Sequence, residues 1–165
     1  MSAKLSVLLC LTLLTGCSGA SNPKALTDQG SEALRSGKYE DAADSFEQAL
    51  AKLGGETSGP EWMRAKLGSI EAQTHIDATK ATEDFLSFAA SNPDRVTDSH
   101  FNLIGSRLGD SGHLAEAFAV LEAGKKAHPE SPHLEALLNE LGKKAESSGD
   151  PDALEAIKSL GYVGD

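Results

Sequence analysis

Residues 101–129, which read FNLIGSRLGDSGHLAEAFAVLEAGKKAHP, decide the fold of this 165-residue chain. Their apolar side chains recur every three or four positions in two runs, one starting at Phe101 and one at Leu114. That spacing places them on one face of a helix, so each run predicts an amphipathic helix. Gly112 lies between the runs, where the chain must turn, and Pro129 follows the second run, where a helix ends. The stretch therefore predicts two helices that fold back on each other.

The same helical spacing continues on both sides of this stretch, from Tyr39 to Leu53 and from Leu134 to Leu141. Alternating runs rich in Val, Ile and Thr, which are typical of strands, are absent from the sequence. Three expected helix starts combine a side-chain acceptor with a proline at the first helical position: Asn22-Pro23, Ser131-Pro132 and Asp150-Pro151. Gly37 and Gly149 mark further turns. The sequence therefore predicts an all-α fold.

The stretch 101–129 also resembles the tetratricopeptide repeat, whose period is about 34 residues. The positions that match its signature are Phe101, Ile104, Gly105, Leu108, Ala117, Leu121 and Pro129. The resemblance implies a right-handed α-solenoid, in which antiparallel helix pairs stack side by side. The alternative is a helical bundle without repeats.

Weaker copies of the pattern occur on either side. A first repeat matches at Leu26, Gly30, Ala33, Gly37, Tyr39, Ala42, Phe46 and Ala49, although Gln29 and Gly54 replace the expected Leu and Pro. A second matches at Ala81, Phe85 and Pro93, with Leu67-Gly68 one residue early. Residues 132–160 lack the signature apart from Leu138 and are interpreted as a terminal capping pair. The expected repeat domain is thus 23–165, with about three repeats plus this cap.

Small residues recur where two helices of a pair must approach each other. Two helices pack closely only where the side chain between them is small, so we interpret Ala42, Ala81 and Ala117 as the sites of close approach. Four residues after each of them comes a larger side chain that is expected to fill the gap to the next helix: Phe46, Phe85 and Leu121.

The first residues of the chain have the layout of a secretory signal. Lys4 precedes an apolar run from Leu5 to Leu14, which is too short to cross a bilayer as a helix. The run ends in Leu14-Thr15-Gly16-Cys17, which resembles the bacterial lipobox, where cleavage before the Cys follows its lipidation. We therefore expect a cleavable lipoprotein signal peptide at 1–16, lipidation of Cys17 and a short tether at 17–22. An ordinary secretory leader followed by an unrelated cysteine is the alternative.

This resemblance also implies a location. Two or three acyl chains on Cys17 would hold the body at a membrane surface outside the cytoplasm, because two chains anchor stably where one binds marginally. In enteric-type bacteria an Asp after the Cys is associated with retention at the inner membrane, and this chain has Ser18 there. The resemblance therefore implies the cell envelope, at an outer membrane facing the periplasm where the organism has one.

Charge and cysteine content argue against several other functions. The chain has 15 Lys and Arg against 25 Asp and Glu, a formal net charge of −10. Nucleic-acid binders need clustered basic residues to neutralise phosphates, and only Lys125-Lys126 and Lys143-Lys144 are adjacent here. Beyond Cys10 in the leader and Cys17 after it there is no cysteine, so the body has neither an internal disulfide nor a cysteine-based zinc site.

No catalytic residue is predicted. Gly109-Asp110-Ser111-Gly112 resembles the nucleophile loop of trypsin-like proteases, but those enzymes need two β-barrels, and here the tetrapeptide falls in the turn between two helices. The five histidines include no HExxH arrangement, so we expect no metal site, and the absence of a phosphate-binding glycine loop leaves no cofactor to propose.

Function is therefore expected at the groove of the stacked helices. In tetratricopeptide proteins the first helix of each pair lines a concave groove that takes an extended or helical segment of a partner protein. By resemblance, the outward-facing groove positions are Thr27, Ser31, Lys66, Gln73, Ser99, Asn102 and Ser106. The Lys and Asn constellation with which some relatives clamp a C-terminal carboxylate is not reproduced at matching positions.

Two functions follow from this groove by analogy with the fold. The first is a lipid-anchored scaffold that binds a protein partner in the cell envelope. The second is a regulatory or accessory subunit of an enzyme of an envelope polymer such as peptidoglycan. A hydrolase in its own right is a distant third, because no nucleophile with a base is identified.

The lipid anchor predicts a specific labelling result. In bacteria grown with labelled palmitate, the wild-type chain should incorporate the label and Cys17→Ala should not, because the thiol of Cys17 is the acceptor. Cys10→Ala is the matched control and should keep the label, since Cys10 belongs to the leader. Equal labelling of Cys17→Ala and wild type would refute lipidation at this residue.

Overall fold

The computed structural model describes residues 22–55 and 57–159, and over these residues the fold is all-α, as predicted, with no strand. The helices are α1 (Pro23–Arg35), α2 (Tyr39–Leu53), α3 (Pro60–Gln73), α4 (Ala78–Ser91), α5 (Asp98–Asp110), α6 (Leu114–Ala127), α7 (Pro132–Ser148) and α8 (Pro151–Ser159). Within this part of the chain, none of the helices has both the length and the apolar character needed to cross a membrane. The expected signal peptide at 1–16, Cys17 and the tether up to residue 21 lie outside the described residues.

Helix starts follow the local chemistry of the sequence. The Asn22 side chain accepts a hydrogen bond from the backbone N–H of Ala25 at 2.7 Å, and Ser131 accepts one from Leu134 at 3.4 Å. Asp150 accepts from the N–H of Asp152 at 3.0 Å. Each acceptor satisfies a donor that the first turn of a helix leaves unpaired, and each precedes the proline that opens the helix. The three predicted starts are confirmed.

The turns require left-handed backbone. Gly37, Gly112 and Gly149 have φ values of 69°, 88° and 69°. Residues with a Cβ rarely adopt these backbone angles, because the Cβ then crowds the following carbonyl group, whereas glycine has no Cβ. These are the three positions at which the sequence predicted turns, so the glycines determine where the chain reverses.

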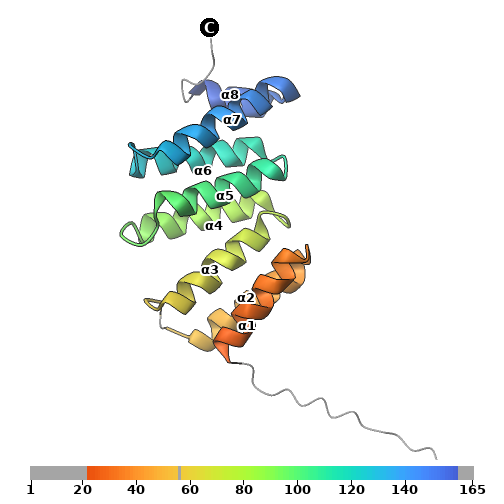
Figure 1. Cartoon of the computed structure of the whole chain (residues 1–165), viewed down its shortest axis with the longest axis vertical. Helices are drawn as coiled ribbons and strands as arrows, with labels where there is room; N and C mark the ends of the chain where they lie inside the picture. The colour runs from red at the N-terminus through yellow and green to blue at the C-terminus, as the bar shows by residue number, and fades with distance from the viewer. Residues whose placement is uncertain (1–21, 56, 160–165) are drawn as a thin grey trace, which may run out of the picture.

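The helices succeed one another along the long axis of the molecule, from α1 and α2 at one end to α7 and α8 at the other (Figure 1). The first helix of each pair contacts the first helix of the next, so that α1, α3, α5 and α7 form one row. On the other side, α6 packs between α4 and α8. This arrangement leaves one long face formed by the odd-numbered helices.

Glycine allows the helices of a pair to touch. A Cβ placed on Gly105 of α5 would lie 2.8 Å from Cδ2 of Leu121 on α6, which is closer than real Cβ atoms approach. Ala117, which lies one helical turn before Leu121, is fully buried, as are Ala42 and Ala81. The burial of these three alanines agrees with the prediction, while the close approach of two helices is observed at Gly105, and close approach at the alanines themselves stays a prediction.

The last pair has the same contact, which the sequence interpretation as a signature-poor cap missed. A Cβ on Gly142 of α7 would lie 2.5 Å from Cδ1 of Ile157 on α8, and Ala153 is fully buried one turn before Ile157. Gly142 and Ile157 are one residue closer in sequence than Gly105 and Leu121. Because the spacing between the glycine and the large side chain is one residue shorter in this pair, a comparison at the spacing of the other repeats does not detect the contact.

α3 departs from simple pairing. It packs more extensively against α2 than against α4, and a Cβ on Gly68 would lie 2.6 Å from Cε1 of Phe46, a side chain of α2. Ala65 and Ala72 belong to the core shared with α1 and α2, whereas Ile70 belongs to the larger core of the later helices. α3 is therefore the link between two cores, and Phe46 is the side chain that binds it to the first pair.

The contact between Gly68 and Phe46 predicts a measurable cost. Gly68→Ala should lower the free energy of unfolding by up to about 2 kcal/mol, because overpacking costs about 1–3 kcal/mol and the higher helix propensity of Ala offsets about 1 kcal/mol of that cost. Urea unfolding followed by circular dichroism measures the difference.

The control is Gly55→Ala, since no atom lies within 4 Å of a Cβ built there, and its effect should stay below about 0.5 kcal/mol. In the Gly68→Ala background, Phe46→Leu should cost less than it does in the wild type, because the smaller side chain relieves the clash. Additive costs of the two substitutions would contradict this packing.

Candidate functional site

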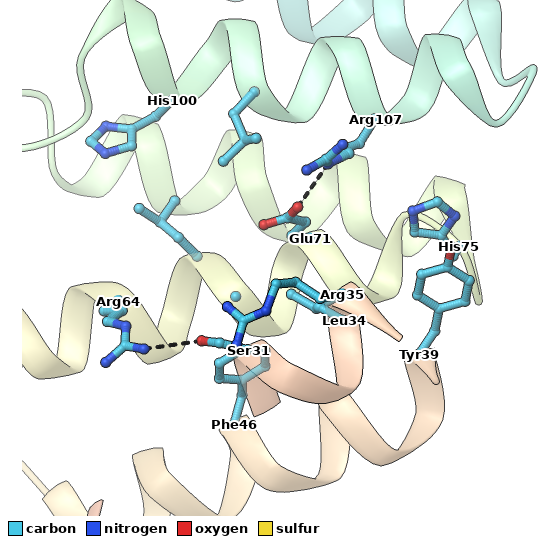
Figure 2. A pocket seen from close by; sticks show the side chains of 13 residues that line it. Ser31, Leu34, Arg35, Tyr39, Phe46, Arg64, Glu71, His75, His100 and Arg107 are labelled. Carbon is cyan, nitrogen blue, oxygen red and sulfur yellow. Dashed lines mark hydrogen bonds and ion pairs between the residues drawn. The ribbon is translucent and has the colours of Figure 1, made fainter. Parts of the chain in front are cut away.

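A groove runs over the face formed by the first helices of the first three pairs (Figure 2). Its volume is about 640 Å³, and we call it the α1–α3–α5 groove. Residues that line it are Ser31, Leu34, Arg35, Tyr39, Phe46, Arg64, Leu67, Gly68, Glu71, His75, His100, Leu103 and Arg107. It is the candidate functional site because three helices contribute both apolar and charged side chains to one concave surface.

Each of the three helices contributes one leucine to the groove: Leu34 from α1, Leu67 from α3 and Leu103 from α5. All three are half-buried. On α5, Leu103 is flanked by a histidine three residues before it and an arginine four residues after it, and α3 repeats the arrangement with an arginine before and a glutamate after. This spacing places the flanking residues on the same face as the leucine. The groove is thus a row of leucines bordered by charged side chains.

Arg64 joins α3 to α1. Its guanidinium lies 2.7 Å from Oδ1 of Asp28 and donates a second hydrogen bond to Oγ of Ser31 at 3.1 Å. The hydrogen bond from Lys24 lowers the pKa of the Asp28 carboxyl below its usual value, and the bond from Arg64 lowers it further. Two charged groups therefore hold Asp28 as a carboxylate at the edge of the groove.

Arg107 crosses in the same way from α5 to α3. Its Nε lies 2.7 Å from Oε1 of Glu71, whose side chain is 18% exposed, whereas that of Arg107 is 45% exposed (Figure 2). Within residues 22–55 and 57–159, the two terminal nitrogens of Arg107 have no hydrogen-bond partner. The ion pair orients the guanidinium and leaves its two terminal nitrogens available to a ligand.

A histidine closes one end of the groove. The ring of His75, in the turn after α3, stacks on Tyr39 with ring centroids 3.8 Å apart and planes 7° from parallel. Its Nδ1 lies 3.1 Å from Oγ of Ser111. Burial lowers the pKa of His75 below its usual value, and the positive charge of Arg107 lowers it further. The neutral imidazole therefore connects the start of α2, the end of α3 and the end of α5.

His100 lies near the other end of the groove. Its Nδ1 accepts a hydrogen bond from the backbone N–H of Thr97 at 3.0 Å and so caps the start of α5. Burial lowers the pKa of His100 as well. Both groove histidines consequently favour the neutral form.

The contact between Ser111 and His75 was not anticipated from the sequence, which placed Gly109-Asp110-Ser111-Gly112 in a turn. The turn itself is observed, since Ser111 caps the C-terminus of α5 and Gly112 has a φ of 88°. Carbonyl groups converge at a helix C-terminus, and they oppose the negative charge that a serine nucleophile must stabilise during acyl transfer. We therefore interpret the Ser111–His75 contact as structural.

The groove positions expected from the resemblance fall largely outside this groove. Ser31 lines it, but Thr27 is fully buried, so the prediction that Thr27 faces outward is wrong. The Thr27 hydroxyl instead donates to the carbonyl of Pro23 at 2.9 Å. The others, which are not among the lining residues, are Lys66, Gln73, Ser99, Asn102 and Ser106. Asn102 donates to the carbonyl of His133 on α7 at 3.2 Å, and partner binding at these five stays a prediction.

The sequence analysis missed the charged residues that do line the groove, above all Arg64, Glu71 and Arg107. A helix buries only part of its circumference, and the packing of neighbouring helices decides which exposed stripe becomes a groove. One available signal was the shared pattern of a central leucine with charged residues three before or four after it on both α3 and α5. Three of the four arginines in the sequence belong to this groove.

The described part of the chain contains no group of three or more His, Cys, Asp or Glu residues arranged to hold a metal ion. Comparison with known proteins finds no family model, no curated protein and no solved structure that matches this chain. Function must therefore be inferred from the geometry and charges of the groove itself.

The histidines of the groove predict a pH-dependent stability. Because the pKa of His75 is lowered from 6.5 in the folded chain, the unfolded chain binds more protons below that pH. The free energy of unfolding should therefore be greatest above pH 6.5 and should decrease as the pH falls below it, with His100 acting in the same direction. Urea unfolding across that range measures the slope.

The double variant His75→Gln/His100→Gln should flatten this slope, since it removes both groups. His133→Gln serves as the control because this histidine is exposed and lies outside the groove. An unchanged slope in the double variant would show that other groups cause the pH dependence.

Proposed function

We propose that this chain is a membrane-anchored, tetratricopeptide-like lipoprotein that acts as a protein-protein interaction scaffold in the bacterial cell envelope. The observation that carries the proposal is the α1–α3–α5 groove, in which three helices align a leucine each and hold charged side chains beside them. Such a surface suits an extended or helical segment of another protein, because apolar side chains supply affinity and charged ones supply specificity.

Repetition along the chain supports the solenoid part of the proposal. Gly30, Gly68, Gly105 and Gly142 recur at nearly equal spacing, one in each odd-numbered helix, and a Cβ on any of them would clash with a large side chain of an even-numbered helix. The contact lies within the pair at Gly30, Gly105 and Gly142 and joins α3 to the preceding pair at Gly68, and contacts repeated along the chain in this way are typical of an α-solenoid. We therefore propose a right-handed stack of helix pairs over 23–165, with α7 and α8 as the last pair.

The sequence alone supports the location. The run Leu14-Thr15-Gly16-Cys17 follows a short apolar segment at the start of the chain, which favours cleavage before Cys17 and its lipidation. We propose that a tether at 17–22 then connects the lipid to α1 and holds the groove close to a membrane outside the cytoplasm. Where the organism has an outer membrane, Ser18 favours its periplasmic face.

Binding is proposed in preference to catalysis. The groove presents arginines paired with carboxylates and a row of leucines, and its neutral histidine contacts a serine at a helix C-terminus. These side chains orient a ligand and provide contact area, but they supply no nucleophile with stabilising donors beside it. The proposal therefore includes no cofactor and no metal.

Crosslinking inside living cells tests the scaffold directly. A photo-reactive phenylalanine derivative at Leu103, in the middle of the groove, should capture one reproducible envelope protein that mass spectrometry identifies. The control places the same photo-reactive derivative at Ala119, which is exposed on α6 outside the groove, and this variant should not capture that envelope protein.

A crosslink from Ala119 alone, or only to other copies of this chain, would overturn the groove assignment. Capture of a peptidoglycan enzyme from Leu103 would favour the regulatory-subunit function over a general scaffold. Saturation mutagenesis separates binding from catalysis, because graded losses across the groove indicate binding, whereas loss confined to one or two irreplaceable polar residues indicates catalysis.

A further inference from the structure

Arginine is concentrated in the groove of an otherwise acidic chain. Arg35, Arg64 and Arg107 line the groove, which leaves only Arg95 elsewhere, although the chain has a net charge of −10. Among the described lining residues, Glu71 is the single carboxylate. Each of these arginines is paired with a carboxylate, of Glu32, Asp28 or Glu71, so the groove is closer to neutral than the acidic chain as a whole and repels a negatively charged segment less.

Arg107 has the geometry of a carboxylate receptor. Glu71 engages its Nε at 2.7 Å, which fixes the plane of the guanidinium, while the terminal nitrogens stay unpaired among the described residues. A carboxylate accepts two parallel hydrogen bonds from a guanidinium, and such bidentate pairs are stronger and more specific than single ones. Arg107 is thus prepared for a second carboxylate without giving up the first.

Arg35 and Arg64 have different roles. Among the residues that the structure describes, Arg35 pairs only with Glu32 on its own helix, and both side chains are 68% exposed, so this ion pair is weak and is readily exchanged for a ligand. Arg64 binds Asp28 and Ser31 through both of its terminal nitrogens and is therefore already occupied. The available positive charge lies at Arg107 on α5 and at Arg35 on α1, the two outer helices of the groove.

The remaining surface favours a protein segment over a nucleic acid or a glycan. In addition to contacts with their charged or polar groups, the bases of single-stranded nucleic acids and the rings of sugars are commonly held by stacking on flat aromatic side chains. Here Tyr39 is already stacked on His75, and Phe46 is 1% exposed beneath the groove. Leu34, Leu67 and Leu103 instead offer a surface for aliphatic or aromatic side chains.

We propose that the α1–α3–α5 groove recognises a partner segment in which Asp or Glu alternates with large apolar residues, and that Arg107 binds one of its carboxylates. This inference rests on the proposed function, because it names the chemistry of the segment that the same groove would hold. The leucines bind the apolar side chains, and Arg35 binds a second acidic residue at the other edge of the groove.

The test starts from a random dodecapeptide display library selected on the full chain in detergent. Selected peptides should be enriched in Asp and Glu together with Leu, Ile or Phe. The best peptide is then labelled and measured by fluorescence anisotropy against its amide counterpart, with Asn for Asp and Gln for Glu. The amide form should bind about tenfold or more weakly, since it loses the charge-assisted bonds.

Variants of the chain assign the contact. Arg107→Gln should weaken binding of the acidic peptide about tenfold or more and leave binding of the amide peptide unchanged. The affinity of Arg107→Lys for the acidic peptide should lie between those of Arg107→Gln and wild type, because lysine keeps the positive charge but cannot donate the two parallel hydrogen bonds of a guanidinium. Lys158→Gln, which removes the same charge from α8 far along the chain, should leave both affinities unchanged. Thermal unfolding checks that each variant is folded.

The outcomes separate the two proposals. If the selected peptides are not enriched in Asp or Glu but bind Leu103→Ser more weakly than wild type, this inference is overturned, while the groove is still a peptide-binding site. Acidic peptides that bind Arg107→Gln as tightly as wild type would overturn the role of Arg107. A library that yields no peptide, together with no crosslink from Leu103, would overturn the inference and the proposed function together.

Discussion

A glycine of one helix packed against a large side chain of another sets how closely the helices of this molecule approach one another. Gly105 against Leu121 and Gly142 against Ile157 bring the helices of a pair so close that a single Cβ would collide. Gly30 and Gly68 both face Phe46, so one aromatic ring fixes two helices of neighbouring pairs. Because these contacts are steric, they determine both the separation and the axial offset of the helices.

The groove follows from that alignment. With α1, α3 and α5 in one row, their leucines share a surface, and the charged side chains beside them can reach across to the neighbouring helix. The bonds of Arg64 to α1 and of Arg107 to α3 lie on partly exposed surface, where ion pairs contribute little to stability. These bonds orient the two guanidiniums along the groove, and the terminal nitrogens of Arg107 are unpaired among the residues that the structure describes.

Charge divides the molecule into two kinds of surface. Acidic residues outnumber basic ones over the whole chain, whereas the groove gathers three of the four arginines and one glutamate. Two histidines border it, and burial lowers the pKa of each, which favours the neutral imidazole. This contrast between the groove and the rest of the chain is the basis of the acidic partner segment proposed above.

The sequence by itself determined the all-α fold, the capped starts at Asn22, Ser131 and Asp150, and the turns at Gly37 and Gly112, because each depends on interactions within a few residues. It also identified the buried alanines, since helical period marks the inner face.

Of the groove positions expected from the sequence, only Ser31 lines the groove, and Thr27 is buried. Tertiary structure alone decided that α3 binds α2 through Phe46, that His75 meets Ser111, and that Arg107 rather than Ser106 faces the groove. The reason is that successive residues of a helix are rotated by about 100° around its axis, so the rotation of a packed helix decides which exposed side chains meet those of its neighbours. That rotation is set by contacts between residues far apart in the sequence.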